Sequence, residues 1–160
     1  MTVPTASPVE ITTPNDRDIV VERVFDAPRD KVWRAFTSRA IVPKWWARGN
    51  ELVVERMELE RGGHWRYVEH SSEGENGFEG RYREVTPPER IVCTFEWDGM
   101  PGHVVVETVT FEDLGDGRTK VVNTSLFHTA EERDDMLNSG MEKGLNQSYA
   151  ALDKVLAEME

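Results

Sequence analysis

The sequence predicts an α+β fold in which a curved antiparallel sheet of seven strands wraps around one long C-terminal helix. Apolar residues recur at every second position through most of the segment 51–127, which is typical of strands with one buried face. They recur with helical spacing after the first strand and again at the C-terminus. Strands grouped in this way favour an antiparallel sheet, because a parallel sheet needs a crossover between successive strands.

The chain begins with a strand and two short helices. The stretch DIVVERVF alternates between apolar and polar residues over residues 19–25. Pro28 then suits the first turn of a helix because its φ angle is already helical, and PRDKVWRAF carries apolar residues at helical spacing. A second short helix is predicted in TSRAIVPKWW, with Thr37 or Ser38 as its cap.

Six further strands and a long helix complete the pattern. The stretches RGG, SSEGENG, TPPE, DGMPG and LGDGR form turns and are short enough to join antiparallel neighbours. A capping box of Thr129 and Glu132 opens a short helical segment after the last strand. The strands are predicted near residues 51–59, 64–70, 78–85, 90–97, 103–112 and 119–127. The apolar stripe of the final helix consists of Met141, Leu145, Ser148 or Tyr149, Leu152, Leu156 and Met159.

A sheet with this many strands is not flat. Its twist makes the strands curl, and a single helix lying across the concave face does not fill the whole groove. The sequence therefore predicts a space between the sheet and the helix, which is a candidate ligand pocket.

Composition limits the classes to which the protein can belong. The 160 residues fit one domain, predicted over residues 18–160, after a flexible tail over residues 1–17 that is rich in Pro, Thr and Asp. The formal charge of −11 opposes binding to nucleic acid and to anionic membrane surfaces. Cys93 is the single cysteine, and the sequence shows neither a leader peptide nor an apolar run long enough to span a membrane. These features predict a cytoplasmic protein.

Four blocks of sequence resemble one known family. They are RVFDAPRDKVWRAFT with the WW that follows, RGGHWRYV, GRYREVTPPERIVCTFEW, and ETVTFED with DGRTKV. In these blocks the chain resembles the homologues of the C-terminal domain of the activator of heat-shock protein 90 ATPase, the AHSA-type proteins. That family belongs to the START, polyketide cyclase and birch-pollen-allergen (SRPBCC) superfamily. The resemblance implies a helix-grip fold. It also implies that Leu145 leaves room in the pocket, since relatives commonly carry Trp in the segment GMEKGLNQS.

The alternation of side chains along each strand predicts which residues line the pocket, once the more apolar set is taken as inward. In RIVCTFEW, for example, that set runs from Ile91 to Trp97. Of Trp45 and Trp46, one is expected to anchor the short helices and the other to border the pocket, because adjacent residues face different surfaces. The alternative is an aromatic core without a ligand. The predicted lining consists of Trp45, Trp46, Trp65, Tyr67, Phe78, Tyr82, Phe95, Trp97, Glu107, Asn123, Ser125, Leu145 and Tyr149.

Glu107 is the most informative of these residues because a buried carboxylate is costly unless it has partners. Desolvation would raise its pKa, whereas an ion pair with Arg66 or hydrogen bonds from Asn123 and Ser125 would lower it. We expect the second outcome, a hydrogen-bonded cluster with a structural role. The alternative is a strand bulge that turns Glu107 to solvent.

No metal site, cofactor or catalytic residue is predicted. The four histidines, His64, His70, His103 and His128, lie on separate strands and loops without metal-ligand spacing. The sequence contains no nucleophile elbow, phosphate-binding loop or dinucleotide fingerprint. Cys93 lies in an apolar strand with no basic partner nearby, so its thiol pKa is expected to be raised.

Three functional interpretations remain, and the favoured one is binding of a small hydrophobic or aromatic molecule without chemistry. The second is a cyclase- or aromatase-like enzyme in which Glu107 or Tyr67 moves a proton. The third, implied by the family name alone, is stimulation of a chaperone ATPase. Neither nucleic acid nor membrane insertion is expected, and a homodimer is left open.

Overall fold

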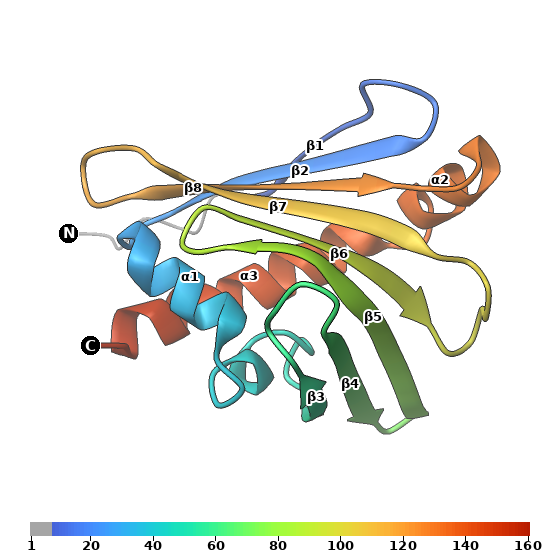
Figure 1. Ribbon diagram of the computed structural model, residues 1–160, viewed down its shortest axis with the longest axis horizontal. Helices are drawn as coiled ribbons and strands as arrows, with labels where there is room; N and C mark the ends of the chain where they lie inside the picture. The colour runs from blue at the N-terminus through green and yellow to red at the C-terminus, as the bar shows by residue number, and fades with distance from the viewer. Residues whose placement is uncertain (1–7) are drawn as a thin grey trace.

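An antiparallel sheet of eight strands carries one long helix across one of its faces, called here the inner face (Figure 1). The computed structural model describes residues 8–160. The strand order is β1-β2-β8-β7-β6-β5-β4-β3, and the edge strands curl around the helix α3. The elements in chain order are β1 (Glu10–Thr12), β2 (Asp18–Phe25), α1 (Arg29–Thr37), η1 (Val42–Lys44), β3 (Glu51–Met57), β4 (His64–Ser71), β5 (Gly74–Thr86), β6 (Arg90–Trp97), β7 (Val105–Asp113), β8 (Thr119–Leu126), α2 (Ala130–Leu137) and α3 (Met141–Glu158).

The α+β class, the antiparallel sheet and the long C-terminal helix are confirmed, but the sheet has eight strands and not seven. The additional strand is β1, which pairs with β2 through Glu10, Ile11 and Thr12. It lies within the segment 1–17 that was predicted as a tail, whose first seven residues are outside the described part of the chain. A strand of three residues with one apolar side chain is too short for its alternation to be recognised.

The helical boundaries follow the local sequence. Pro28 occupies the N-cap of α1, one residue before the helix begins, with a φ of −67°. The second predicted helix is only the 3₁₀ turn η1, because Pro43 breaks the hydrogen-bonding pattern that a longer helix would need. At α2 the side chain of Thr129 accepts a hydrogen bond from the backbone N–H of Glu132, which confirms the predicted cap. None of the helices in residues 8–160 has the length and apolar character needed to cross a membrane.

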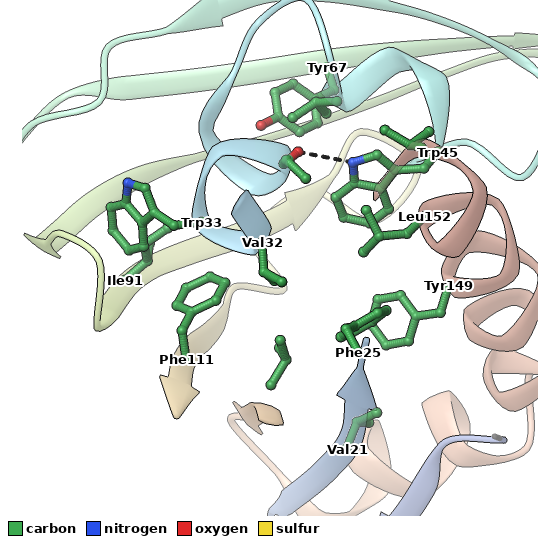
Figure 2. Packing of buried hydrophobic residues seen from close by; sticks show 14 of the residues in the cluster. Val21, Phe25, Val32, Trp33, Trp45, Tyr67, Ile91, Phe111, Tyr149 and Leu152 are labelled. Atoms are coloured by element: carbon green, nitrogen blue, oxygen red, sulfur yellow. Dashed lines mark hydrogen bonds between the residues drawn. The ribbon is translucent and has the colours of Figure 1, made fainter. Parts of the chain in front are cut away.

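The densest part of the core lies where α1 and the C-terminal half of α3 meet the sheet (Figure 2). Phe25, Val32 and Leu152 have no accessible surface there, and Phe111 is 2% exposed. Rings interlock at this end: Phe25 meets Tyr149 edge to face, with centroids 5.1 Å apart. This end of the groove is therefore completely filled.

An ion pair fixes α3 to the sheet within this core. Arg23 of β2 donates two hydrogen bonds to the carboxylate of Asp153 on α3, at 2.7 and 2.6 Å. The guanidinium carbon also lies 4.6 Å from the centroid of the Phe25 ring. Such a fork fixes orientation, because both nitrogens must meet both oxygens. The pair therefore sets where α3 crosses the sheet.

We expect Leu152→Ala to destabilise the fold by about 2–5 kcal/mol, because it empties a fully buried position between α3 and the sheet. Urea unfolding followed by circular dichroism measures this. The matched control is Lys154→Ala, an exposed position on the same helix, which should change the free energy of unfolding by less than about 0.5 kcal/mol. Equal effects at the two positions would show that α3 is not docked as described.

Candidate ligand site beneath the C-terminal helix

Burial of the inward side chains beneath α3 is uneven: Val105 and Ser125 are buried next to half-buried Glu107 and Asn123. Phe111 of β7 and Val121 of β8 are each 2% exposed, whereas Glu107 and Asn123, further along the same strands, are only half-buried. On α3, Leu152 is fully buried and Leu145 is half-buried. The central strands have neighbours on both sides, so their inward side chains face α3 and the residues packed beside it. We call the region formed by five half-buried residues of the sheet and of α3 the gap; these residues are Cys93, Glu107, Asn123, Met141 and Leu145.

A row of polar side chains crosses the sheet at the gap. The strand register places Cys93 opposite Glu107, Glu107 opposite Ser125, and Tyr82 opposite Cys93 on the other side. The hydroxyl of Ser125 donates a hydrogen bond of 2.7 Å to Oε2 of Glu107. At the end of the row, burial raises the pKa of Tyr67 well above its ordinary value, and the hydrogen bond between Tyr67 and Tyr82 adds to this rise. Glu107 lies in the middle of this row.

Burial raises the pKa of Glu107 from 4.5 to about 7, and hydrogen bonds from Ser125 and Asn123 oppose this rise. The predicted hydrogen bonds therefore exist, but the expectation that they hold the pKa down is wrong, because desolvation is the larger effect. Burial, assisted by the charge of Glu107, raises the pKa of Cys93 and that of Tyr149 to about 12 each, which confirms the raised thiol pKa. The register of β7 with β6 and β8 is continuous through Glu107, which excludes the predicted alternative of a bulge, and alternation with the buried Val105 and Phe111 places Glu107 on the inner face.

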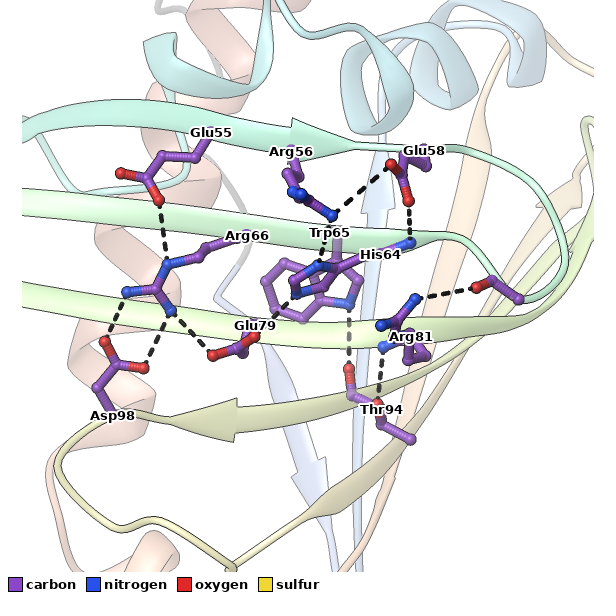
Figure 3. A network of polar contacts seen from close by, with 11 residues as sticks. Glu55, Arg56, Glu58, His64, Trp65, Arg66, Glu79, Arg81, Thr94 and Asp98 are labelled. Atoms are coloured by element: carbon purple, nitrogen blue, oxygen red, sulfur yellow. Dashed lines mark hydrogen bonds and ion pairs between the residues drawn. The ribbon is translucent and has the colours of Figure 1, made fainter.

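Arg66, the predicted ion-pair partner of Glu107, lies on the opposite face of the sheet (Figure 3). Its guanidinium donates two hydrogen bonds to Asp98, at 3.1 and 2.7 Å, and further ones to Glu55 and Glu79. Asp98 raises the pKa of Arg66, and Arg66 in turn lowers that of Asp98. The reason is the alternation along β4, which turns Arg66 outward between the inward Trp65 and Tyr67.

Other inward-facing carboxylates have arginine partners. Glu69 of β4, 3% exposed, accepts hydrogen bonds from Arg48 at 3.1 and 2.7 Å. The aliphatic part of Arg48 passes α3 at Gly144, where a Cβ would lie 3.4 Å from its Cδ. Asp153 has Arg23. Glu107, in contrast, forms no ion pair with any residue in the range 8–160.

Aromatic rings from three strands and one loop pack beside this row. Trp46 meets Tyr67 and Phe78 nearly edge to face, with centroids 5.3 and 5.2 Å apart. Phe95 lies 5.6 Å from Phe78 and 5.9 Å from Trp65, and the Trp65 indole N–H donates to the carbonyl of Thr94. The structure thus packs together five of the aromatic residues that the sequence predicted to line the ligand pocket.

The two adjacent tryptophans have different surroundings. Trp45 is 4% exposed, and its indole N–H donates a hydrogen bond of 3.0 Å to the carbonyl of Ala35 in α1 (Figure 2). Trp46 is half-buried and points toward β4 and β5, where it contacts Tyr67 and Phe78. Trp45 is thus the anchor of the short helices, and Trp46 is the one directed toward the aromatic cluster.

Trp97 does not join this cluster, although its position on β6 opposite Phe78 agrees with the predicted alternation. It is 38% exposed, and its indole N–H donates to Oδ1 of Asn76 at 3.1 Å. The prediction that it lies inside is wrong because β6 ends at Trp97. Around it lies an open depression of about 440 Å³, lined by Arg66, Val68, Glu75, Asn76, Gly77, Trp97, Asp98 and Gly99.

Within residues 8–160, no three His, Cys, Asp or Glu side chains are grouped so that they could hold a metal ion. His64 pairs with Glu79 at 2.8 Å on the outer face, and His103 pairs with Glu132 of α2. Asn123 is the unusual member of the site, because its buried Oδ1 accepts no hydrogen bond from the described residues.

Sequence reasoning left Cys93 and Met141 out of the predicted lining. Alternation along β6 predicted that Cys93 faces inward. Its position between Tyr82 and Glu107 depends on how β5, β6 and β7 pair, and alternation within one strand does not give that pairing. Met141 could have been found from the stripe of the final helix, of which it is the first member.

Comparison with known proteins identifies the family. The model of the family described as "Activator of Hsp90 ATPase homolog 1-like protein" matches residues 26–157. The chain belongs to this family. No curated protein matches it.

Solved structures of similar proteins share the fold of this family member. A protein from Rhodobacter sphaeroides is 28% identical, with a TM-score of 0.89 over 96% of this chain and 100% of the other. Protein Ms6760 from Mycobacterium smegmatis is 18% identical, with a TM-score of 0.84 over 96% and 99%. DynU16, a protein of the dynemicin biosynthetic locus, is 19% identical, with a TM-score of 0.68 over 91% of this chain and 48% of the other. The last two likenesses concern the fold alone.

The raised pKa of Glu107 predicts that its ionisation opposes folding. In the unfolded chain the carboxyl ionises near 4.5 and in the folded protein near 7, so the folded protein keeps the proton longer as the pH rises. Stability is therefore lost between these values, by an amount of order 3 kcal/mol. Glu107→Gln removes this loss, so its stability relative to the parent should increase from pH 4.5 to pH 8, measured by urea unfolding.

The control for this prediction is Glu112→Gln, an exposed position on the same strand. Its stability difference from the parent should stay nearly constant over the same pH range. A pH-independent difference for Glu107→Gln as well would show that Glu107 is not desolvated.

Proposed function

We propose that this protein binds a small apolar or aromatic molecule in the gap between the sheet and the N-terminal half of α3. The observation that carries the proposal is that Glu107, on the inner face of two central strands, is half-buried and is held by Ser125 among half-buried apolar side chains of the sheet and of α3. A mostly apolar site with a few converging polar groups is the usual form of a ligand pocket.

The lining supports a flat or aromatic ligand. Trp46, Phe78 and Phe95 present rings at one side of the gap, and Met141 and Leu145 of α3 supply flexible apolar side chains at the other. Methionine and leucine adapt to different ligand shapes, whereas fixed rings favour flat ones. Leu145 in particular leaves room that a larger residue would fill.

An enzymatic function of the cyclase or aromatase kind is the second candidate, and one observation favours it. A carboxyl with a pKa of about 7 can give or accept a proton near neutral pH, as a general acid or base must. Tyr67 is a weaker candidate for this role, because burial and its hydrogen bond to Tyr82 raise its pKa well above 10.0. A chaperone-stimulating function rests on the name of the family alone.

Leu145→Trp tests the binding site directly. The larger ring should fill the gap and lower the affinity for N-phenyl-1-naphthylamine, a neutral fluorescent probe, by roughly tenfold or more, which is about 1.4 kcal/mol. Lys143→Trp adds the same ring at an exposed position of α3 and should leave binding unchanged.

Probe fluorescence gives the affinities, and urea unfolding shows whether both variants remain folded. If the parent protein binds no probe, or if Leu145→Trp binds it as well as the parent does, the gap is not a binding site. Native mass spectrometry of freshly purified protein adds an independent test, since a resident ligand would appear as additional mass.

A further inference from the structure

Glu107 differs from the other inward-facing carboxylates in its partners. Glu69 and Asp153 each bind an arginine at 2.7 Å or less. Glu107 has the hydroxyl of Ser125 and the amide of Asn123, and the described residues offer it no cation. A desolvated carboxylate without a cation is costly to ionise, so this position favours a ligand that brings a positive charge.

The geometry leaves Glu107 able to bind such a charge. Ser125 binds Oε2, and a carboxylate has about four acceptor positions on its two oxygens. Part of the Glu107 surface is accessible from the gap, while Cys93 and Ser125 flank it on the adjacent strands. An ammonium group has three donors and can use several of these acceptor positions together.

The rings near Glu107 suit the same ligand. Phe95 lies one inward position beyond Cys93 on β6, and Tyr149 of α3 is close enough for the charge of Glu107 to raise its pKa. The faces of aromatic rings attract cations, and they also pack on flat apolar groups. The formal charge of −11 further attracts cations to the protein and repels anions.

We propose that the molecule bound in the gap is an aromatic or apolar amine whose protonated nitrogen forms the ion pair with Glu107. This inference rests on the proposed function and narrows the class of ligand. The apolar part lies against Trp46, Phe78 and Phe95, and the ammonium lies at the centre of the polar row.

The pH dependence of binding follows from the groups that face Glu107. These are Cys93 of β6, Ser125 and Asn123 of β8, and Tyr149 of α3. Cys93 and Tyr149 both have pKa values of about 12 and stay neutral near neutral pH. A primary amine stays protonated up to about pH 10. The affinity for an amine should therefore rise by roughly tenfold from pH 6 to pH 8, following the ionised fraction of Glu107.

Three matched ligands test the inference: 2-naphthylmethylamine, 2-naphthalenemethanol and 2-methylnaphthalene. They share one ring system and differ in carrying a cation, a neutral donor or neither. Each is titrated against N-phenyl-1-naphthylamine bound to the parent protein, to Glu107→Gln and to the outward control Glu112→Gln. At pH 8 the amine should bind the parent and Glu112→Gln at least roughly tenfold more tightly than the alcohol does. Glu107→Gln should lose this preference and the pH dependence while it still binds the probe.

The outcomes separate the two proposals. Suppose that the parent protein binds the probe and that Leu145→Trp abolishes this binding. If the amine then displaces the probe no better than the alcohol does, or if neither ligand displaces it, the proposal of an amine ligand is wrong and the proposed site remains supported. A preference for the amine that persists in Glu107→Gln would also overturn it. Absence of probe binding to the parent protein would instead reject the site itself. The pH titration of the parent protein needs no variant, so a folding defect of Glu107→Gln cannot obscure the result.

Discussion

The ion pair between Arg23 and Asp153 fixes the C-terminal half of α3 to the sheet, and the rest of the structure depends on this attachment. Hydrogen bonds from Val9 to Asn146 and from Ser148 to Trp46 hold the preceding turns of the helix. Around the pair, Phe25, Phe111 and Leu152 fill the groove completely. Towards its N-terminus α3 passes over a mixed surface, on which Val105 and Ser125 are buried and Glu107, Asn123 and Leu145 are half-buried. The same helix thus covers a filled core at one end and half-buried polar and apolar side chains at the other.

The proposed ligand site accounts for the polar residues in the middle of the sheet. Glu107 lowers the stability of the fold when it ionises, and Asn123 keeps an acceptor oxygen without a partner among the described residues. Neither feature is needed for a close-packed core, which apolar residues would stabilise more simply. Functional sites commonly retain such unfavourable groups because a ligand or a reaction uses them. The aromatic cluster and the polar row are therefore the two features that support the proposed ligand site.

Much of this arrangement could be predicted from the sequence, and the failures have identifiable physical causes. Alternation along β7 and β8 correctly turned Glu107, Asn123 and Ser125 inward, because both strands are central and have one buried face. Alternation does not report where a strand ends, so Trp97 was wrongly placed inside. It also does not show how strongly a group is desolvated, which depends on side chains brought from α3 and from neighbouring strands. The balance of effects on the pKa of Glu107 was misjudged for that reason.

The central claim, that Glu107 lies in a desolvated gap without a cationic partner, is tested most directly by carbon NMR of the protein labelled with ¹³C-glutamate. The chemical shift of the Glu107 carboxyl carbon is followed against pH, and Glu107→Gln assigns the signal by its loss. The structure predicts a titration midpoint at about 7. A midpoint near the ordinary value of 4.5 would contradict the account, because it would mean that solvent or a cation reaches the carboxylate.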